Sequence, residues 1–482
     1  MATSRLGWLR LLHWILFFFK LKASNATFNA SRLVTRGAWI TDADTGQRVK
    51  LKCVNWYGAH QERHMVGGLE LRGAQDLVAL LASTGANCVR ITLSIELTKY
   101  NPYLAHYPQT RALHAMDQVV AYLNAHQIMV IMNNHVSWAA WVGGMDHSQQ
   151  GLWHLPAHNY TASDWIDSLR SIAQRYRGKI IGIDLRNEIH DQDGVEIDWG
   201  QTQSIESDWL TAATLASDAI HDEDPDLLIF VGGLCWNFDL RAMMRNIGPA
   251  KVHARRKLVY AVHAYTFSFV WRSDEVQLWL FEVKAISFWF FAFSIALYWI
   301  WMGGSLPKPQ DFLWLSLVIF PVLLAGLTIL SDQVRAAKCA CLNLDHYLGT
   351  VAAGTLATAA SWIYLVKDRR AFWLLGGMAS LYVYGFAKFM LSEMAMQAFL
   401  GLWALQDRQV PVWVAEVGTG DPDFYDWQWL WHYIRRKHDL DFAYWAFNGR
   451  KWDGKWKDEP FGLATQDYTK LRKPCFTETL FA

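Results

Sequence analysis

Two glutamates stand at the ends of short apolar runs that lie far apart in the chain. Glu188 falls near the end of IIGIDLRNEIH, and Glu416 near the end of PVWVAEVG. Such runs are typical of buried strands, and reactive side chains of α/β barrels gather where strands end and loops begin. Cleavage of a glycosidic bond needs two facing carboxyl groups, one protonated to help the leaving oxygen depart and one ionised to attack the anomeric carbon. The pair therefore predicts this acid–base and nucleophilic chemistry.

Strand-like runs that alternate with helical stretches would position the two glutamates. Helical stretches are expected at 71–83, 110–125, 163–176 and 209–220. Eight strands are expected, at 50–55, 88–93, 128–133, 180–187, 227–232, 258–264, 412–417 and 442–447. Alternation of this kind favours a parallel sheet, and eight repeats favour its closure into a barrel. The expected fold class is α/β, a (β/α)8 TIM barrel with Glu188 and Glu416 at the ends of strands four and seven.

One connection, between strands six and seven, is far longer than the others and changes composition abruptly. It contains three runs without Asp, Glu, Lys or Arg, at 285–304, 312–330 and 346–366, and a shorter fourth run at 371–387. Each of the three is long enough to cross a bilayer core, although a buried helical hairpin is the alternative. Both parts of one barrel must lie on the same side of the membrane, so an even number of crossings is required. We therefore expect an all-α transmembrane four-helix insertion.

The apolar segments predict how the chain is divided and on which side of a membrane the barrel lies. The expected organisation is a signal peptide or signal anchor at 1–24, a first barrel part at 25–284, the transmembrane insertion at 285–388 and a last barrel part at 389–482. The basic loop 367–370 is expected in the cytoplasm, which puts the barrel on the extracellular or luminal side of the plasma membrane or secretory pathway. N-glycosylation triplets at Asn25, Asn29 and Asn159 agree with that side.

The composition limits the classes of ligand that the protein is expected to bind. The 45 Lys+Arg and 44 Asp+Glu leave a net charge of +1, which argues against nucleic-acid binding. No Cys/His cluster has the spacing of a metal site, so neither a metal nor another cofactor is expected. Cys53, Cys88, Cys235 and Cys475 are either core thiols or disulfides, and their types and spacing do not decide between the two. The 27 Trp suggest membrane interfaces or a ligand with flat apolar faces.

Seven motifs, in order along the chain, carry a family resemblance. They are KCVNWYG, GANCVRITLS, IMNNH, RNEI, YAVHAY, VAEVG and YWAFNG, one on each expected strand except the fifth. With them the chain resembles glycoside hydrolase family 5, the cellulase family, over about 35–285 and 389–475. That family is a retaining one, with its acid/base after an Asn on strand four and its nucleophile on strand seven. The block 285–388 departs from the usual family pattern.

Carried over position by position, the resemblance implies a role for each matching residue. Glu188 would be the acid/base and Glu416 the nucleophile. The implied substrate-binding residues are Arg90, which would keep Glu416 ionised, Asn187 for the sugar 2-hydroxyl, His135, His263, Tyr265 near the nucleophile, and Trp445 as a stacking floor. Taken singly, each has an ordinary alternative, such as a core histidine, a surface ion pair or a packed tryptophan. Trp56, Trp138, Trp141, Trp236 and Trp452 are further platform candidates, with core packing as the alternative.

The sequence thus predicts a membrane-anchored retaining β-glycoside hydrolase that acts on a β-linked glucan, endo-β-1,4-glucanase-like, or on a mannan. Transglycosylation is the near alternative because a sugar can intercept the same covalent intermediate. A non-catalytic, membrane-bound polysaccharide-binding protein is the alternative from another class. The expected partners are a polysaccharide or oligosaccharide and the lipid bilayer. The choice of glycan, endo against exo action, signal cleavage and oligomeric state are not predicted.

Overall fold

Eight parallel strands close into a barrel in the computed structural model, which describes residues 32–141, 150–266, 409–423 and 425–482. Around the barrel the strands follow the order β10-β3-β4-β5-β6-β7-β8-β9. Their bounds are β3 Lys52–Trp56, β4 Cys88–Ser94, β5 Met129–Val136, β6 Gly182–Asp184, β7 Leu228–Gly232, β8 Leu258–His263, β9 Val412–Val417 and β10 Asp441–Tyr444. The predicted eight-stranded barrel is confirmed, and each strand overlaps its predicted range, although β6 is shorter than the expected 180–187.

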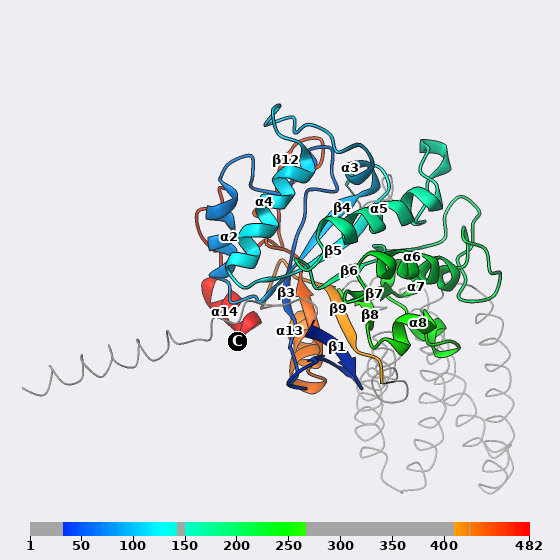
Figure 1. The fold of residues 1–482 in the computed structure, drawn as a ribbon. Helices are drawn as coiled ribbons and strands as arrows, with labels where there is room; N and C mark the ends of the chain where they lie inside the picture. Colours follow the sequence, from blue (N-terminus) through cyan, green and yellow to red (C-terminus); the bar gives the residue numbers. More distant parts are fainter. Residues whose placement is uncertain (1–31, 142–149, 267–408, 424) are drawn as a thin grey trace, which may run out of the picture.

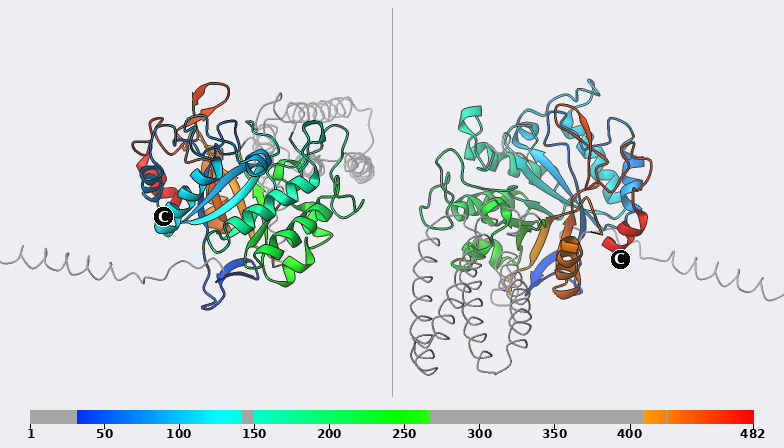
Figure 2. Two further views of the ribbon diagram at one scale, coloured as in Figure 1. Left: turned by 45° about the horizontal axis from the view of Figure 1, so that its top comes forward. Right: turned by 180° about the vertical axis from the view of Figure 1, so that it is seen from behind.

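Helices surround the barrel (Figure 1), and two views show them outside the strands (Figure 2). The longer ones are α2 Ala74–Ala82, α4 Ala112–Ala125, α5 Ala162–Arg175, α6 Trp209–Glu223, α13 Tyr425–His432 and α14 Pro474–Phe481. Short helices are α3 Ile95–Tyr100, α7 Leu234–Asn237 and α8 Ala250–Ala254, with 3-10 turns at Pro156–His158 and Arg241–Met244 and a π-helical turn at Tyr433–Lys437. The expected helical stretches are α2, α4, α5 and α6.

Local sequence explains where these helices begin and which face they bury. In α4 the buried residues recur every three or four positions, at Leu113, Met116, Val120 and Leu123, so one stripe packs on the barrel. At the start of α5 the Thr161 hydroxyl accepts from the Asp164 amide while the Asp164 carboxylate accepts from the Thr161 amide. This capping box satisfies two amides that lack a partner within the helix.

The barrel interior has an apolar end closed by a hairpin that the sequence did not predict. Strands β1 (Leu33–Arg36) and β2 (Trp39–Asp42) pair antiparallel before the barrel begins. Leu33 and Ile40 of this hairpin pack in one buried cluster with residues at the amino ends of the barrel strands, including Leu51, Cys53 and Trp413. The hairpin therefore covers the amino end of the barrel, where β1 lies in Figure 1.

One disulfide joins two neighbouring strands at this apolar end. Cys53 of β3 and Cys88 of β4 are partners in the parallel register and form the bond. Cys235 is buried and Cys475 is exposed, and neither takes part in this disulfide. The structure thereby decides, for Cys53 and Cys88, a choice between core thiols and a disulfide that the sequence had left open.

The long connection enters and leaves the barrel between adjacent strands. β8 and β9 pair side by side, with Tyr260 opposite Val412, although residues 264–411 separate them in the sequence. The four expected transmembrane runs and the expected signal segment 1–24 lie outside the described residues. Within the described ranges, no helix combines the length and the hydropathy that a membrane crossing needs.

Candidate active site

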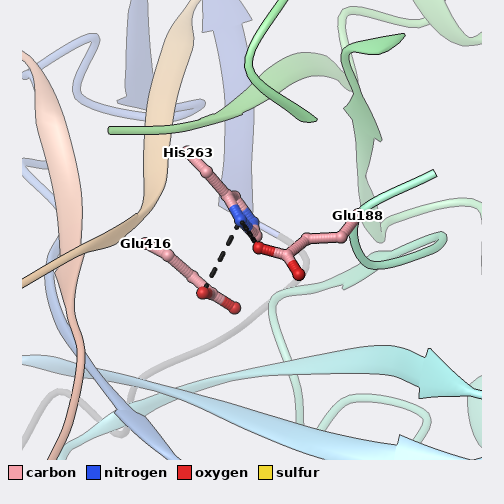
Figure 3. Close-up of side chains that lie close together, drawn as sticks. All are labelled: Glu188, His263 and Glu416. Carbon is pink, nitrogen blue, oxygen red and sulfur yellow. Dashed lines mark hydrogen bonds and ion pairs between the residues drawn. The ribbon is translucent and has the colours of Figure 1, made fainter. Parts of the chain in front are cut away.

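The two predicted glutamates meet across the carboxyl end of the barrel. Glu416 lies at the end of β9, and Glu188 lies in the loop after β6. His263, at the end of β8, stands between them: its Nδ1 is 3.0 Å from Glu188 Oε1 and 3.6 Å from Glu416 Oε2 (Figure 3). One carboxylate oxygen of each glutamate and this nitrogen all lie within 4.8 Å of one another. The two carboxyl groups that glycosidic bond cleavage requires therefore lie close enough together to act on the same bond.

Glu416 is held by two hydrogen-bond donors, one for each of its oxygens. Arg90 Nη1 donates to Oε1 over 2.7 Å, and the Tyr265 hydroxyl donates to Oε2 over 2.9 Å. Arg90 is fully buried and stays charged, because the carboxylates of Asp184 and Glu416 outweigh the effect of burial and raise its pKa. Both contacts orient the Glu416 carboxylate toward the space beside Glu188.

Arg90 also organises the polar layer around Glu416. Its Nε donates to Asp184 Oδ2 over 2.8 Å, and its other guanidinium nitrogens donate to Asn55 Oδ1 and Asn187 Oδ1. Since the Asn187 oxygen is occupied by Arg90, its amide nitrogen is the group that can serve a sugar hydroxyl. The sequence predicted Arg90 and Asn187 but missed Asp184 and Asn55, although a charged residue inside an otherwise apolar strand is a signal that could have found Asp184.

The two carboxyl groups differ in their surroundings. Burial raises the pKa of Glu188 to about 7, so this group carries a proton over much of the neutral range. Burial raises the pKa of Glu416 too, but the charge of the Arg90 guanidinium and its hydrogen bond act in the opposite direction. The pKa of His263 is lowered to about 4 by burial, which leaves its imidazole neutral. A direct guanidinium contact therefore favours the ionised form of Glu416 alone, and Glu188 is the natural proton donor.

The backbone at Glu188 corrects one sequence prediction. The strand expected at 180–187 ends at Asp184, and Glu188 has a φ of +44°, which no extended strand accommodates. Arg186 holds this loop: its guanidinium donates to the carbonyls of Gln150 and Leu152 and to Asn134 Oδ1. Positive φ at a non-glycine residue is unfavourable and persists where surrounding bonds impose it. The loop therefore aims the Glu188 carboxyl at His263, and Arg186 is a residue that sequence reasoning missed.

Aromatic rings line the site beside the carboxyl pair. Trp445 follows β10 directly, and its amide donates to the Val417 carbonyl, next to Glu416. Its ring stacks on Tyr57 at 4.9 Å and 4°, and His135 stacks against it at 5.9 Å. The Tyr57 hydroxyl donates to Glu459 over 2.6 Å, which fixes the ring. The structure thus brings Trp445 and His135 into the site and adds Tyr57, whose place in the KCVNWYG motif was the available signal.

The other tryptophan candidates separate into two groups. Trp56 is fully buried, donates to the Gly67 carbonyl and packs edge-on against Phe447, so it is a core residue and not a sugar platform. Trp138 is 38% exposed, and Trp141, Trp236 and Trp452 are partly exposed. These four remain accessible to a ligand.

Glu188, His263 and Glu416 are also the three residues of the described ranges that come close enough to hold a cation. Both Glu416 oxygens already accept hydrogen bonds, and the Arg90 charge lies 2.7 Å from one of them. A cation here would face that guanidinium at short range. The donor set therefore fits proton transfer better than metal binding.

The chain is similar to known proteins in sequence and in fold. The sequence profile of "Cellulase (glycosyl hydrolase family 5)" matches residues 44–282. A "Glycosyl hydrolase 5 family protein" of Chamaecyparis obtusa is 30% identical over 270 residues, 50% of this chain and 45% of that protein. The "Major extracellular endoglucanase" of Xanthomonas campestris is 28% identical over 244 residues, 46% of this chain and 47% of that protein. The chain thus spans about half the length of these curated relatives.

Solved structures share the fold at lower identity. An endocellulase from Pyrococcus horikoshii, determined with cellotetraose, superposes with a TM-score of 0.58 at 18% identity, covering 95% of this chain and 100% of that one. The catalytic domain of the Xanthomonas campestris endoglucanase gives 0.56 at 19% identity, covering 93% and 99%. At this identity the likeness establishes the barrel alone.

Proposed function

The profile match and the curated relatives support a glycosidase of glycosyl hydrolase family 5, and from that premise we propose that the chain is a retaining endo-β-glucanase acting on β-1,4-linked glucan. The observation that carries the proposal is the approach of Glu188 and Glu416, with one oxygen of each within 4.8 Å. Retaining glycosidases place their carboxyl groups about 5 to 5.5 Å apart, whereas inverting enzymes leave roughly 6.5 to 9.5 Å for a water molecule. The observed spacing favours retention.

Each step of a double displacement has a residue suited to it. Glu416 Oε attacks the anomeric carbon while the Glu188 proton passes to the departing glycosidic oxygen, so a glycosyl–Glu416 ester forms and Glu188 becomes a carboxylate. Glu188 then takes a proton from water, whose oxygen attacks the same carbon and releases Glu416. Neutral His263 is hydrogen-bonded through Nδ1 to Glu188 Oε1, so it can donate its Nδ1 hydrogen to the Glu188 carboxylate once the proton has left.

The bound sugar would be oriented by the residues around the pair. Trp445 lies beside Glu416 with its ring stacked on Tyr57, and the 8% of the residue that stays exposed would contact a pyranose ring. The Asn187 amide nitrogen would donate to the sugar 2-hydroxyl, since Arg90 occupies the Asn187 oxygen. A hydrogen bond at that hydroxyl strengthens in the transition state of glycoside cleavage.

The test is hydrolysis by the detergent-solubilised full chain, followed by NMR of the first anomer released. We expect β-glucan to be cleaved within the chain and the β-anomer to appear first, before mutarotation. Mannan in the same panel tests the choice of sugar. Release of the α-anomer would exclude Glu416 as the nucleophile. A lack of turnover on all β-glycans would exclude the proposed hydrolase activity.

We also propose that the barrel is anchored to a membrane, on its extracellular or luminal side. The support is the uncharged runs at 285–304, 312–330 and 346–366 in the sequence, together with the pairing of β8 and β9, which requires an even number of crossings. The Cys53–Cys88 disulfide supports an oxidising compartment. Asn159 is exposed and open to glycosylation. Loss of an enzymatic deglycosylation shift in Asn159→Gln would support that side; Asn25 and Asn29 need removal in the same background.

A further inference from the structure

The loop after β7 holds the main chain on both sides of Glu188. β7 pairs with β6, and Glu188 lies in the loop after β6. The Trp236 amide donates to the Ile189 carbonyl over 2.8 Å. The Asn237 side-chain amide donates to the Arg186 carbonyl over 3.4 Å. Because one acceptor precedes Glu188 and the other follows it, the main chain at the candidate acid/base cannot shift without breaking one of these bonds.

A side-chain hydrogen bond also fixes the peptide carbonyl of Glu188. His190 Nδ1 lies 2.7 Å from that carbonyl oxygen, and a carbonyl can only accept, so Nδ1 carries the hydrogen. Glu188 has a φ of +44°, a left-handed conformation that is unfavourable for a residue with a side chain. The same conformation points the Glu188 carboxyl at His263 (Figure 3). By holding the carbonyl, His190 therefore holds the conformation that aims the carboxyl.

The His190 imidazole is held in turn by Trp236. The two rings stack with their centres 3.5 Å apart and their planes at 9°. The Gly151 main chain lies close to the same imidazole, since a Cβ at that residue would come within 2.6 Å of His190 Cδ2 and Nε2. The Gly151 carbonyl also accepts from the His190 amide over 3.1 Å. The ring therefore has little freedom to turn away from the Glu188 carbonyl.

The main-chain conformation around Trp236 is unusual. Cys235, Trp236 and Asn237 have φ values of +50°, +62° and +59°, so three consecutive residues with side chains are left-handed. Residues other than glycine visit this conformation singly, and each instance is unfavourable. Such conformations persist where the surrounding structure imposes them, and they gather at active sites. Here the left-handed turn places the Trp236 indole on the His190 ring.

Neither core packing nor sugar stacking alone accounts for these contacts. Trp56, a tryptophan of the core, is fully buried, whereas Trp236 is partly exposed. A sugar platform needs an open face, and the His190 imidazole already covers one face of the Trp236 indole. Fixing the orientation of His190 requires that contact and the left-handed turn that makes it.

We propose that His190 and Trp236 are positioning residues for the acid/base: Trp236 holds the imidazole, and the imidazole holds the main chain that presents the Glu188 carboxyl to the leaving oxygen. This inference rests on the proposed function, because it assigns residues to its proton-transfer step. Loss of the hydrogen bond lets the carboxyl leave that position, so protonation of the departing oxygen becomes slower. Glu416 is held by other residues, so its attack on the anomeric carbon is unaffected.

The test uses the full chain in detergent with two substrates that share a cellobiosyl group and differ in leaving group. Cellotetraose releases a sugar, which needs a proton from the general acid, whereas 2,4-dinitrophenyl β-cellobioside releases a phenolate that leaves without one. His190→Phe keeps a flat ring against Trp236 but has no donor. In this variant kcat/KM for cellotetraose should fall roughly tenfold, as the loss of one hydrogen bond allows. For the dinitrophenyl substrate kcat/KM should stay within about twofold of the wild type.

Variants of Trp236 test the other half of the inference. Trp236→Leu removes the ring that holds His190 and should show the same selective loss, while Trp236→Phe keeps an aromatic face and should restore most of the activity. Adding Trp236→Leu to His190→Phe should cost little more than His190→Phe alone, because both residues act through one hydrogen bond.

His126→Phe is the matched control. His126 Nδ1 also donates to a main-chain carbonyl, that of Tyr122 over 2.9 Å, but His126 is exposed at the carboxyl end of α4, next to the amino end of β5. This variant removes the same kind of hydrogen bond far from the carboxyl pair, so kcat/KM should be unchanged for both substrates.

The outcomes separate this inference from the proposed function. An equal loss on both substrates in His190→Phe, or no loss on either, would overturn the inference while the hydrolase stands. If His190→Phe does not fold, the comparison of Trp236→Leu with Trp236→Phe decides, by whether the loss is selective for cellotetraose. A rise in KM confined to the Trp236 variants would assign Trp236 to sugar stacking and also overturn the inference. Hydrolysis of neither substrate by the wild type would overturn both.

Discussion

The barrel interior holds two layers that the same strands build with opposite chemistry. In the layer near the amino ends, Cys53, Cys88 and Ile131 lie in a buried apolar cluster. Two positions further along the same three strands, Asn55, Arg90 and Asn133 point inward and form the polar layer around Glu416. Because side chains alternate across a strand, a shift of two residues keeps the inward face and changes only the depth.

The two layers differ in what burial does to them. The apolar layer gains free energy from burial, whereas the polar layer buries Asp184, Arg90 and Glu416 together. Within the described residues, Asp184 Oδ1 and His263 Nε2 have no hydrogen-bond partner, which adds a further penalty. The comparison teaches that stability resides in the amino-end layer, while the carboxyl-end layer is held in place by the surrounding fold for its chemistry. Substitutions in the apolar layer should therefore change stability without changing activity, whereas substitutions in the polar layer can change both.

The largest effect is expected from Glu416→Gln in the polar layer. The amide keeps the size of the side chain but cannot form a stable glycosyl ester, so kcat should fall by about 10^4-fold or more while glycan binding persists. Initial rates on soluble β-glucan measure the loss, and retardation in glucan-containing gels measures binding. Turnover within tenfold of the wild type would exclude the nucleophile role.

Arg90→Gln should be the most destabilising change in the polar layer. It leaves the buried carboxylates of Asp184 and Glu416 without their cation, which typically lowers the free energy of unfolding by about 3 to 5 kcal/mol. Ile131→Val in the apolar layer is the matched control and should cost only about 0.5 to 1.5 kcal/mol without loss of turnover. Chemical unfolding followed by tryptophan fluorescence compares the two. Equal losses would contradict the division between the layers.

Removal of the disulfide tests whether the apolar layer can lose stability without a loss of activity. Cys53→Ala with Cys88→Ala opens a link across 35 residues and should lower the free energy of unfolding by about 2 to 4 kcal/mol. Below the unfolding temperature, kcat/KM should match the wild type, because neither sulfur contacts the carboxyl pair. A selective loss of activity in the folded variant would show that the layers are coupled.

How much the sequence could predict differs between the same two layers. Strand positions followed from apolar runs, and Glu188 and Glu416 followed from where those runs end. Asp184 and Arg186 were missed because their partners, Arg90 and the carbonyls near Gln150, are distant in sequence and adjacent only in the closed barrel. The β1–β2 hairpin was missed because two strands of four residues give little periodicity. The pairing of Cys53 with Cys88 likewise needed the strand register.

The pH dependence of Glu188 sharpens the comparison within the polar layer. With its pKa at about 7, the general acid loses its proton as pH rises, so kcat/KM should fall tenfold per pH unit above about 7. A pKa raised on folding stabilises the protein below the unfolded value, near pH 4.5, and that stability is lost as pH rises through 7.

The variant Glu188→Gln cannot ionise, so its comparison with the wild type measures the stability that is lost when Glu188 ionises. It should be more stable than the wild type at pH 8, by on the order of 2 kcal/mol, and this advantage should vanish near pH 4. Thermal unfolding at the two pH values measures the difference. The same variant should lose the alkaline limb of the rate profile along with most of its turnover. An equal stability difference at both pH values would contradict a raised pKa for Glu188.

The smallest expected effect concerns Asp184, which shares the Arg90 charge with Glu416. Asp184→Asn keeps an acceptor for Arg90 Nε but removes a negative charge, so the guanidinium acts more strongly on Glu416 and lowers the pKa of the nucleophile. The acidic limb of the kcat/KM profile should move to lower pH by less than about one unit, and kcat should fall modestly because a better stabilised carboxylate is a weaker nucleophile. Asp167→Asn, exposed on α5, is the control. A shift confined to the alkaline limb would show that Asp184 acts on the pKa of Glu188 and not on that of Glu416. Asp184 would then not belong to the polar layer around Glu416.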